Sequence, residues 1–348
     1  MAGGAQPHEP KRRSVRFAPF VADIAAILVA VGLRFYVPPA EWVERAYSNG
    51  AYPHIDAAIR AISQPVPFSL GDALLIVVLV TLATWLFDAV RSAIRHRAFG
   101  RAGAAVLRML AVLALVFVWF VLGWGLSYDR VPVAAKIAVD NERTNETSVD
   151  AFADRVAAEL NATAPVAHAA PLPSVAEIGA RLVPTFDATI RRLGDDASFS
   201  APPIKPTIFQ PLMAASGSDG FMDPWTHELN VDATLSPYER PAVYAHEWAH
   251  LSGFADESEA NFIAVLSCRN AGDPVLRYSG WLLTWFNLPS NVHVTQSLSG
   301  FAAADVEAIR RRYVRQVNQT VAHANIPKNT LLRKIKKYGI QPREYEEL

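Results

Sequence analysis

The sequence predicts a mainly α-helical protein, with three transmembrane helices followed by a predominantly helical domain that carries a small β element. Of its 348 residues, 51% are hydrophobic and only 19% are charged, a balance too apolar for an ordinary soluble protein. Three apolar runs of about twenty residues lie before residue 127, and a run of that length can cross a bilayer as a helix. After residue 130 the composition becomes that of a water-soluble domain, with apolar residues at helical spacing.

The predicted spans are residues 17–37, 72–90 and 104–126. No small-residue cleavage site follows the first run, so we expect an uncleaved anchor rather than a signal peptide that is removed. Three runs of this length are hard to place in one globular core, which argues against a buried hairpin of a soluble protein. Residues 38–68 are predicted to form a loop with a short helix. Aromatic residues near the far end of the third span suit an interfacial belt (Trp119, Trp124, Tyr128).

Basic residues set the expected orientation of these spans. They lie before the first span and between the second and third (Lys11, Arg12, Arg13, Arg16, Arg91, Arg95, Arg97, Arg101). Because cytoplasmic loops carry an excess of Lys and Arg, both segments are predicted to be cytoplasmic. The expected divisions of this multi-pass cell-membrane protein are therefore a cytoplasmic segment at 1–16, a membrane anchor at 17–129 and an extracytoplasmic domain at 130–348.

The second part contains His246-Glu247-Trp248-Ala249-His250, an HExxH motif. Residues four apart share one face of a helix, so the two imidazoles can bind a single ion. Neutral His nitrogens suit Zn²⁺, and an open coordination position lets the ion acidify a water molecule. Glu247, next to the first His, is then the candidate general base. The motif predicts a zinc-dependent hydrolase.

Helix signals surround the motif. Ser236 and Glu239 have capping-box spacing before it, although Pro241 gives an alternative start, and Gly253 supplies a stop after His250. A second helix is predicted from Asp256. Two short helices joined by a tight turn would fold the start of the second helix back over the metal.

The second helix is expected to supply the third protein ligand, and both Glu257 and Glu259 qualify. Glu259 has an alternative role in capping the helix, which favours Glu257 as the ligand. Asn261 is four residues after Glu257, so one of the pair can reach the ion while the other bonds a ligating His.

HExxH together with ESEAN at residues 257–261 resembles the gluzincin clan of metallopeptidases, which pair HExxH with a downstream Glu and an Asp or Asn four residues later. The chain is also similar to an uncharacterised bacterial family of three-span membrane proteins with an HExxH domain. PFSLGD (67–72), WGLSYDR (124–130), GFMDPWTHELNV (220–231) and residues 246–262 carry that similarity. The resemblance implies a membrane-tethered, zinc-dependent, peptidase-like protein with a zincin-like domain.

Short β-type runs are predicted at residues 207–210 and 229–234. In gluzincins an edge strand beside the zinc helix pairs with the substrate backbone, and HELNV at 227–231 is the piece that could do so here. The resemblance then places Glu228 and Asn230 near the cleft. A surface hairpin with solvated polar side chains is the alternative.

A further helix is predicted from Asp273-Pro274. Its residues Arg277 and Tyr278 could each donate to an oxyanion, as could two His residues elsewhere, although ordinary structural roles are open for all four (Arg277, Tyr278, His293, His227). The single cysteine, Cys268, excludes an intrachain disulfide and is expected to be a small core residue.

The predicted cofactor is Zn²⁺, and the predicted partners are the lipid bilayer and a peptide or protein substrate. Zero formal net charge gives no electrostatic argument for nucleic acid. Two other functions stay open: a non-catalytic zinc-binding receptor or assembly protein, and an intramembrane protease. The second is disfavoured because charged residues and prolines flank the HExxH motif on both sides. The sequence does not indicate an oligomeric state.

Overall fold

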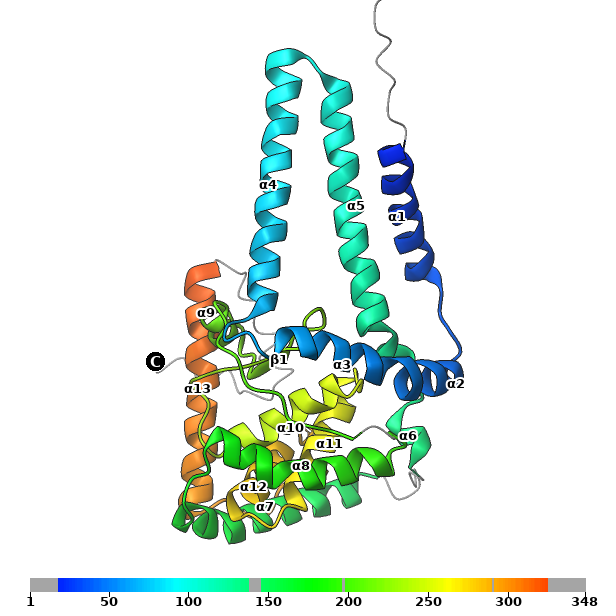
Figure 1. The fold of residues 1–348 in the computed structure, drawn as a ribbon. Coiled ribbons are helices and arrows are strands. Elements are labelled where there is room, and N and C mark those ends of the chain that lie inside the picture. Colours follow the sequence, from blue (N-terminus) through cyan, green and yellow to red (C-terminus); the bar gives the residue numbers. More distant parts are fainter. Residues whose placement is uncertain (1–17, 138–144, 196–197, 290, 325–348) are drawn as a thin grey trace, which may run out of the picture. The chain divides into compact units, whose positions relative to one another are not determined.

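The structure is a computed structural model that describes residues 18–324, except 138–144, 196–197 and 290 (Figure 1). These residues are mainly helical, as predicted. They divide into two compact units: one comprises the chain up to Val37 together with Ile76–Val121, and the other comprises Pro38–Leu75 together with the chain from Leu122 onward. The predicted boundary at residue 130 does not coincide with this division.

The first unit holds α1 (Ala18–Phe35) and most of α4 (Leu70–His96) and α5 (Phe99–Gly123). Helices α4 and α5 run antiparallel and are joined by a short turn (Figure 1). Both are long and apolar enough to cross a membrane. A third candidate span exists if Phe20–Phe35 of α1 and the helical stretch Ala40–Ser63, which are bent by 111° at the break between them, are counted as one. The chain therefore has two or three candidate membrane spans.

Residues 38–68 differ from the prediction of a loop with a short helix. The structure has a nearly continuous helical stretch there: α2 (Ala40–Trp42), the π-helix η1 (Val43–Ala51) and α3 (Tyr52–Ser63). Pro53 explains the π-helix, because in an α-helix its ring would crowd the carbonyl group four residues earlier. The wider turn avoids this, and the Tyr52 N–H bonds to the Tyr47 carbonyl, five residues back.

After α5 come the 3₁₀-helix η2 (Gly125–Asp129) and α6 (Val133–Lys136), then α7 (Glu146–Ala169) and α8 (Val175–Arg192). A capping box between Ser174 and Glu177 starts α8, with bonds in both directions. Helix α8 continues through Pro184 without a break. Pro184 lies on its exposed face, where water can satisfy the carbonyl that the missing N–H leaves free.

The β element is a two-stranded antiparallel sheet of β1 (Gly220–Met222) and β2 (Leu229–Val231), and it follows α9 (Gln210–Ser216). Ile204 forms an isolated parallel bridge to Leu229 on β2. The prediction of a strand at 207–210 was wrong, since Thr207 and the Ile208 N–H bond to the Asp72 carboxylate instead.

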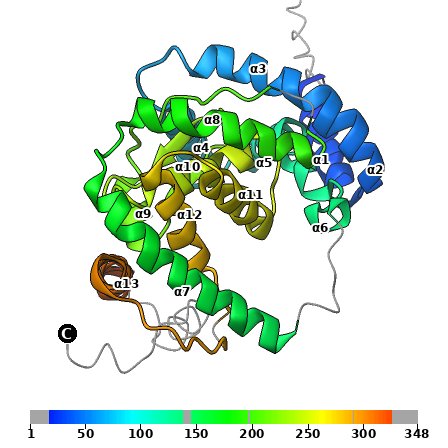
Figure 2. The same cartoon turned by 90° about the horizontal axis from the view of Figure 1, so that it is seen from below.

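Four helices complete the chain: α10 (Arg240–Leu251), α11 (Glu257–Arg269), α12 (Pro274–Phe286) and α13 (Gly300–Ala324). Figure 2 shows α10, α11 and α12 between α8 and α7. The core of this unit includes buried side chains of α7, α12 and α13 (Val156, Leu160, Val275, Leu282, Val306, Ile309). The layer formed by α10 and α11 carries the HExxH motif and the acidic residues that follow it.

Candidate metal centre

Helices α10 and α11 bring His246, His250 and Glu257 together. The Nε2 atoms of the two His residues are 3.0 Å apart. The Glu257 carboxylate lies 3.3 Å from the Nε2 atom of His246 and 3.6 Å from that of His250. Within the described residues, these three form the one group of His, Cys, Asp or Glu side chains spaced to hold a metal ion.

The turn between α10 and α11 fixes the protonation of His250. Gly253 ends α10 with a φ of +76°, a conformation that favours glycine, and the chain then folds back. The Phe254 carbonyl oxygen comes within 2.8 Å of His250 Nδ1. Because a carbonyl oxygen only accepts, Nδ1 carries the proton in the neutral ring and Nε2 presents a lone pair.

Two side-chain amides, of Asn287 and Asn261, fix the protonation of His246 in the same way. Asn287 Nδ2 donates to the Leu283 carbonyl oxygen at 2.9 Å, so Asn287 Oδ1 is left to accept from Asn261 Nδ2 at 3.0 Å. Asn261 Oδ1 therefore faces His246 Nδ1, at 2.9 Å, as an acceptor. Since this series of hydrogen bonds ends on a carbonyl oxygen, the direction of each bond is determined, and His246 Nε2 also presents a lone pair.

The spacing of these atoms fits a metal site. Two lone pairs 3.0 Å apart repel each other unless a cation lies between them. Zinc bonds to nitrogen and oxygen of about 2.0–2.1 Å in a tetrahedral site place neighbouring ligand atoms about 3.3 Å apart. The observed separations of 3.0, 3.3 and 3.6 Å bracket that value. The residues present therefore suit a zinc ion in both chemistry and spacing.

The two acidic candidates for third ligand have different partners. Glu257, at the first position of α11, is the one beside the imidazoles, and its bonds with His246 and His250 lower the pKa of its carboxyl group. Glu259 points elsewhere and accepts a hydrogen bond from the Val133 N–H, at the start of α6, at 2.6 Å. The cap of α11 is Asp256, whose side chain accepts from the N–H groups two and three residues on.

Glu247 is buried between α10 and β1. Its carboxylate accepts a hydrogen bond from the Met222 N–H, and burial raises its pKa, although His246 and His250 oppose the shift. Gly220 makes this packing possible, because a Cβ atom there would lie 2.8 Å from Cγ and Cδ of Glu247 and closer still to Oε1. Glycine at this strand position therefore leaves the space that the carboxylate occupies.

The C-terminal carbonyl groups of α10 are bonded by side chains from outside the motif. Trp124 Nε1 donates to the His250 carbonyl at 2.8 Å, and the Tyr52 hydroxyl donates to that of Leu251 at 2.6 Å. Arg130 Nη1 donates to the Gly253 carbonyl at 3.0 Å, and its guanidinium stacks on the Phe254 ring, 4.0 Å from the centroid. Glu44 holds the other side of the Arg130 guanidinium, at 3.1 and 3.0 Å. These bonds hold the end of α10 and the turn that fixes His250.

Glu228 and Asn230, predicted near the cleft, are both buried. The Glu228 carboxylate accepts from the Lys205 ammonium at 2.6 Å and from the Leu70 and Gly71 N–H groups, at 3.1 and 2.9 Å, and so caps α4. These donors lower its pKa against the effect of burial. Asn230 lies opposite Phe221 in the sheet, and its buried Oδ1 atom has no hydrogen-bond partner among the residues that the structure describes.

The side chains suggested as donors to an oxyanion make contacts elsewhere in the fold or lie exposed. The Tyr278 hydroxyl donates to Asp305 at 2.7 Å, and the His227 ring is buried against Asp56, its Nδ1 atom 2.9 Å from the carboxylate. The His293 side chain is exposed, and the backbone N–H of His293 donates to the Asp150 carboxylate of α7. Cys268 is fully buried, as expected of a core residue, and burial raises the pKa of its thiol.

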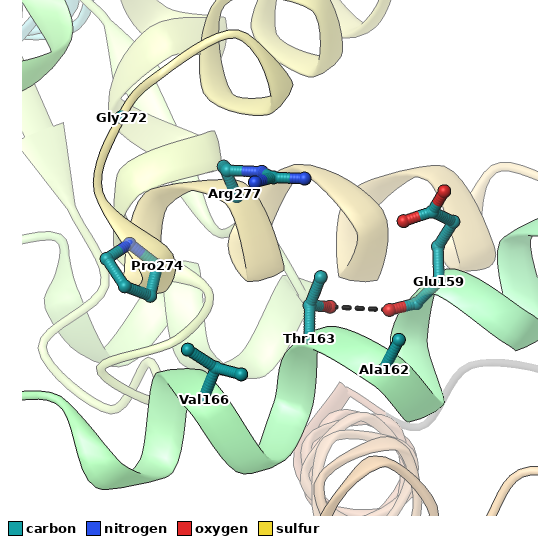
Figure 3. Close-up of a pocket in the computed structure, with 7 residues that line it drawn as sticks. All are labelled: Glu159, Ala162, Thr163, Val166, Gly272, Pro274 and Arg277. Carbon is teal, nitrogen blue, oxygen red and sulfur yellow. Dashed lines mark hydrogen bonds between the residues drawn. The ribbon is translucent and has the colours of Figure 1, made fainter.

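Arg277 lines a separate hollow of about 280 Å³ between α7 and the start of α12 (Figure 3). Thr163 and Glu159 of α7 form part of its wall and are joined by a bond from the Thr163 hydroxyl to the Glu159 carbonyl. None of the residues around the two imidazoles lines this hollow. The hollow is therefore separate from the His–His–Glu cluster.

The fold and the cluster together define a class: a mainly helical protein with two or three candidate membrane spans and a His–His–Glu group that can hold a metal ion. A family model described as "Protein of unknown function (DUF3810)" matches residues 47–336. The chain therefore belongs to the DUF3810 family. Comparisons with curated proteins and with solved structures gave no match.

Proposed function

We propose that this protein is a membrane-anchored, zinc-dependent metallopeptidase whose zinc ligands are His246, His250 and Glu257. The observation that carries the proposal is the pair of Nε2 lone pairs that face each other at 3.0 Å beside a carboxylate. Hydrogen bonds on the far side of each ring fix this arrangement. Imidazoles that bind a metal through one ring nitrogen commonly donate a hydrogen bond from the other.

Zinc in such a site acts as a Lewis acid, lowering the pKa of a water molecule and polarising a carbonyl group. Glu247 is the general base that removes the proton from the attacking water and returns it to the leaving amine. Burial against β1 suits this role, since it raises the pKa of the carboxyl group and brings its proton affinity nearer to that of the groups it serves. The N–H of Met222 orients the carboxylate.

The likeness to gluzincins supports the same assignment. His246, Glu247, His250 and Glu257 occupy the positions of the clan's motif, and Asn261 takes the place of its Asp or Asn, bonded to a ligand imidazole. The zincin-like character of the fold is part of this proposal.

The strand that pairs with substrate is proposed to be β1 rather than β2. Strand β2 has a neighbour on each side, β1 and Ile204, whereas within the described residues β1 pairs on one side only. An extended peptide could add to its free edge. Phe221 on β1 is 46% exposed and offers an apolar contact for a substrate side chain.

The proposed orientation puts the N-terminus in the cytoplasm and the catalytic residues outside. Charge asymmetry around the candidate spans supports it. Reporters fused after residues 98 and 135 test it, and a reporter active in the cytoplasm after residue 135 would reverse the assignment.

The central experiment compares full-length wild type with Glu247→Gln. The variant should retain one zinc per chain by elemental analysis, because the ligands are unchanged, yet lose proteolysis. Full activity in the variant would show that Glu247 is not the base. A wild-type protein that binds zinc and cleaves no peptide bond in any assay would instead favour the structural metal site of a receptor or assembly protein.

A matched pair of variants tests the third ligand. Glu257→Ala should lower zinc content, since its carboxylate lies beside both imidazoles. Glu259→Ala should keep zinc and lower only the melting temperature, because that side chain bonds to α6. The reverse order would transfer the ligand role to Glu259.

A further inference from the structure

The proposed zinc site is bonded directly to the ends of the candidate membrane spans. Trp124 is the first residue after α5, and its indole N–H donates to the carbonyl of His250, a proposed ligand. Its ring also stands edge-on to the His250 ring, with the centroids 6.3 Å apart. One hydrogen bond therefore separates the end of α5 from the metal site.

The start of α4 is tied to the other side of the site. Glu228 caps its first N–H groups, and the Asp72 carboxylate accepts from Thr207 and the Ile208 N–H, at 2.9 and 2.7 Å. Glu228 immediately precedes β2, whose partner β1 lies against Glu247. Lys205 strengthens the junction, donating to Glu228 and to the carbonyls of Ser63 and Phe68.

The segment after α1 makes a third connection. Tyr52 of α3 bonds the Leu251 carbonyl, and Glu44 of η1 holds the Arg130 guanidinium that bonds the turn after α10. The chain thus reaches the site from each candidate span through hydrogen bonds within one compact unit. Within the described residues of this unit, these hydrogen bonds join the site to Leu70, Gly71 and Trp124 at the ends of α4 and α5.

The distance to the bilayer follows from chain connectivity. Helix α5 has 25 residues, and at 1.5 Å per residue it is about 37 Å long, somewhat more than the roughly 30 Å of a hydrocarbon core. Its end therefore lies near the lipid headgroups when the helix spans the membrane. With His250 bonded to Trp124, the proposed metal site lies within on the order of 10 Å of that end, a length of about three extended residues.

Apolar side chains around the base of α4 fit the same position. Phe68, Ile208 and Leu212 are more than half exposed, and Ile208 is bonded through its backbone to Asp72. Because Phe68 and Ile208 adjoin the start of a candidate span, the covering expected for them is the headgroup region of the bilayer.

From these contacts we infer that the substrates are membrane-anchored polypeptides, cut in the segment that directly adjoins one of their own transmembrane helices. The inference rests on the proposed peptidase function and adds the substrate class. A site fixed this close to the lipid meets extended chain that leaves the bilayer. A soluble protein must approach the same site against the membrane surface.

The first test maps cleaved bonds in cells. Membranes from cells that express full-length wild type or Glu247→Gln are compared by mass spectrometry of new N-termini. Most termini that require Glu247 should lie within about ten residues of the outer end of a transmembrane segment. Termini spread through soluble proteins, or far from any span, would overturn the inference while leaving the peptidase function intact. The absence of any Glu247-dependent terminus would overturn the function and, with it, the inference.

The second test moves the cleaved bond of an identified substrate. Wild-type protein and substrate are placed together in phosphatidylethanolamine–phosphatidylglycerol vesicles. A 15-residue helical spacer between the span and the cleaved segment lifts that segment by about 22 Å. Cleavage should fall at least tenfold relative to the parent substrate, whereas a spacer of the same length placed beyond the cleaved bond should leave the rate unchanged. Equal rates for both spacers would overturn the inference.

Discussion

Gly220→Ala is expected to abolish most of the proposed activity without loss of metal. The new methyl group would lie 2.8 Å from Cγ and Cδ of Glu247, where ordinary contacts between carbon atoms are about 3.5–4.0 Å. Glu247 is buried, so its carboxylate cannot swing into solvent to avoid the clash. Either the carboxylate or β1 must move by about 1 Å.

The size of the effect follows from that displacement. A misplacement of about 1 Å at a reacting group costs about 10²-fold in rate. Because the atoms nearest to the new methyl group belong to Glu247 and not to a proposed ligand, we expect kcat to fall by about that factor while zinc content stays at one per chain.

The assay uses full-length protein in vesicles, with kcat measured on a substrate found in wild-type cells and zinc measured by elemental analysis. Gly272→Ala is the matched control, because a Cβ atom there meets no atom within 4 Å. Its kcat should equal that of wild type. If Gly220→Ala also retained the wild-type kcat, the placement of the Glu247 carboxylate against β1 would not matter for catalysis.

Three further predictions concern metal affinity, stability and pH. Asn261→Leu should weaken zinc binding by about 10–100-fold, because His246 loses the acceptor that fixes its tautomer. Asn261→Asp keeps an acceptor and should bind zinc nearly as well as wild type. Equal affinities of the two variants in a chelator competition would show that the bond from His246 to residue 261 does not support zinc binding. Lys205→Met should lower the free energy of unfolding by about 3–5 kcal/mol, since it removes one partner of a buried ion pair. Adding Glu228→Gln should recover part of the loss. A Lys205→Met variant as stable as wild type would show that the ion pair does not stabilise the fold. Burial raises the pKa of Glu239 to about 7, from an ordinary value of 4.5. Between these values the folded state binds more protons than the unfolded state, so wild-type stability should fall as pH rises from 4.5 to 7, by up to about 3 kcal/mol. Glu239→Gln should flatten that part of the stability profile, and an unchanged slope would show that another group titrates there.

Local signals in the sequence were sufficient to predict the two helices that carry the candidate metal ligands. Gly253 ends α10 in a left-handed conformation, Asp256 caps α11, and the spacing of His246 and His250 puts both on one face. Each of these features depends on residues within about four positions of one another. The start of α10 at Arg240 follows the alternative that Pro241 offered.

The contacts that position the site join residues far apart in the chain, and periodicity carries no information about them. Trp124 suits an aromatic belt at the end of a span, and nothing in its neighbourhood indicates that its indole bonds a carbonyl 126 residues later. Glu228 illustrates the same limit. Its place in HELNV suggested a role at the cleft, but the carboxylate caps a helix that begins 158 residues earlier.

Gly220 could have been noticed from the sequence, but not explained. A glycine inside a short strand marks a close approach by another group. Which group approaches depends on the antiparallel register of β1 against β2 and on the packing of α10 over both. That register was missed because the first strand was predicted at 207–210, where Asp72 instead binds the backbone.

The two ends of α10 are held by different sets of contacts, and those at its C-terminal end join residues from both sides of position 130 within one compact unit. At its start, the Arg312 guanidinium joins Glu239 to Asp219, which directly precedes β1, at 2.5 and 3.0 Å. At its end, the carbonyl groups are bonded by Tyr52, Trp124 and Arg130, all of which lie before residue 131. A chain beginning at residue 131 would keep the HExxH motif and Glu257 but would lack every donor in this second set. The turn that fixes the His250 tautomer is therefore held by residues that adjoin the candidate spans, so a candidate metal site built from His246, His250 and Glu257 depends on them.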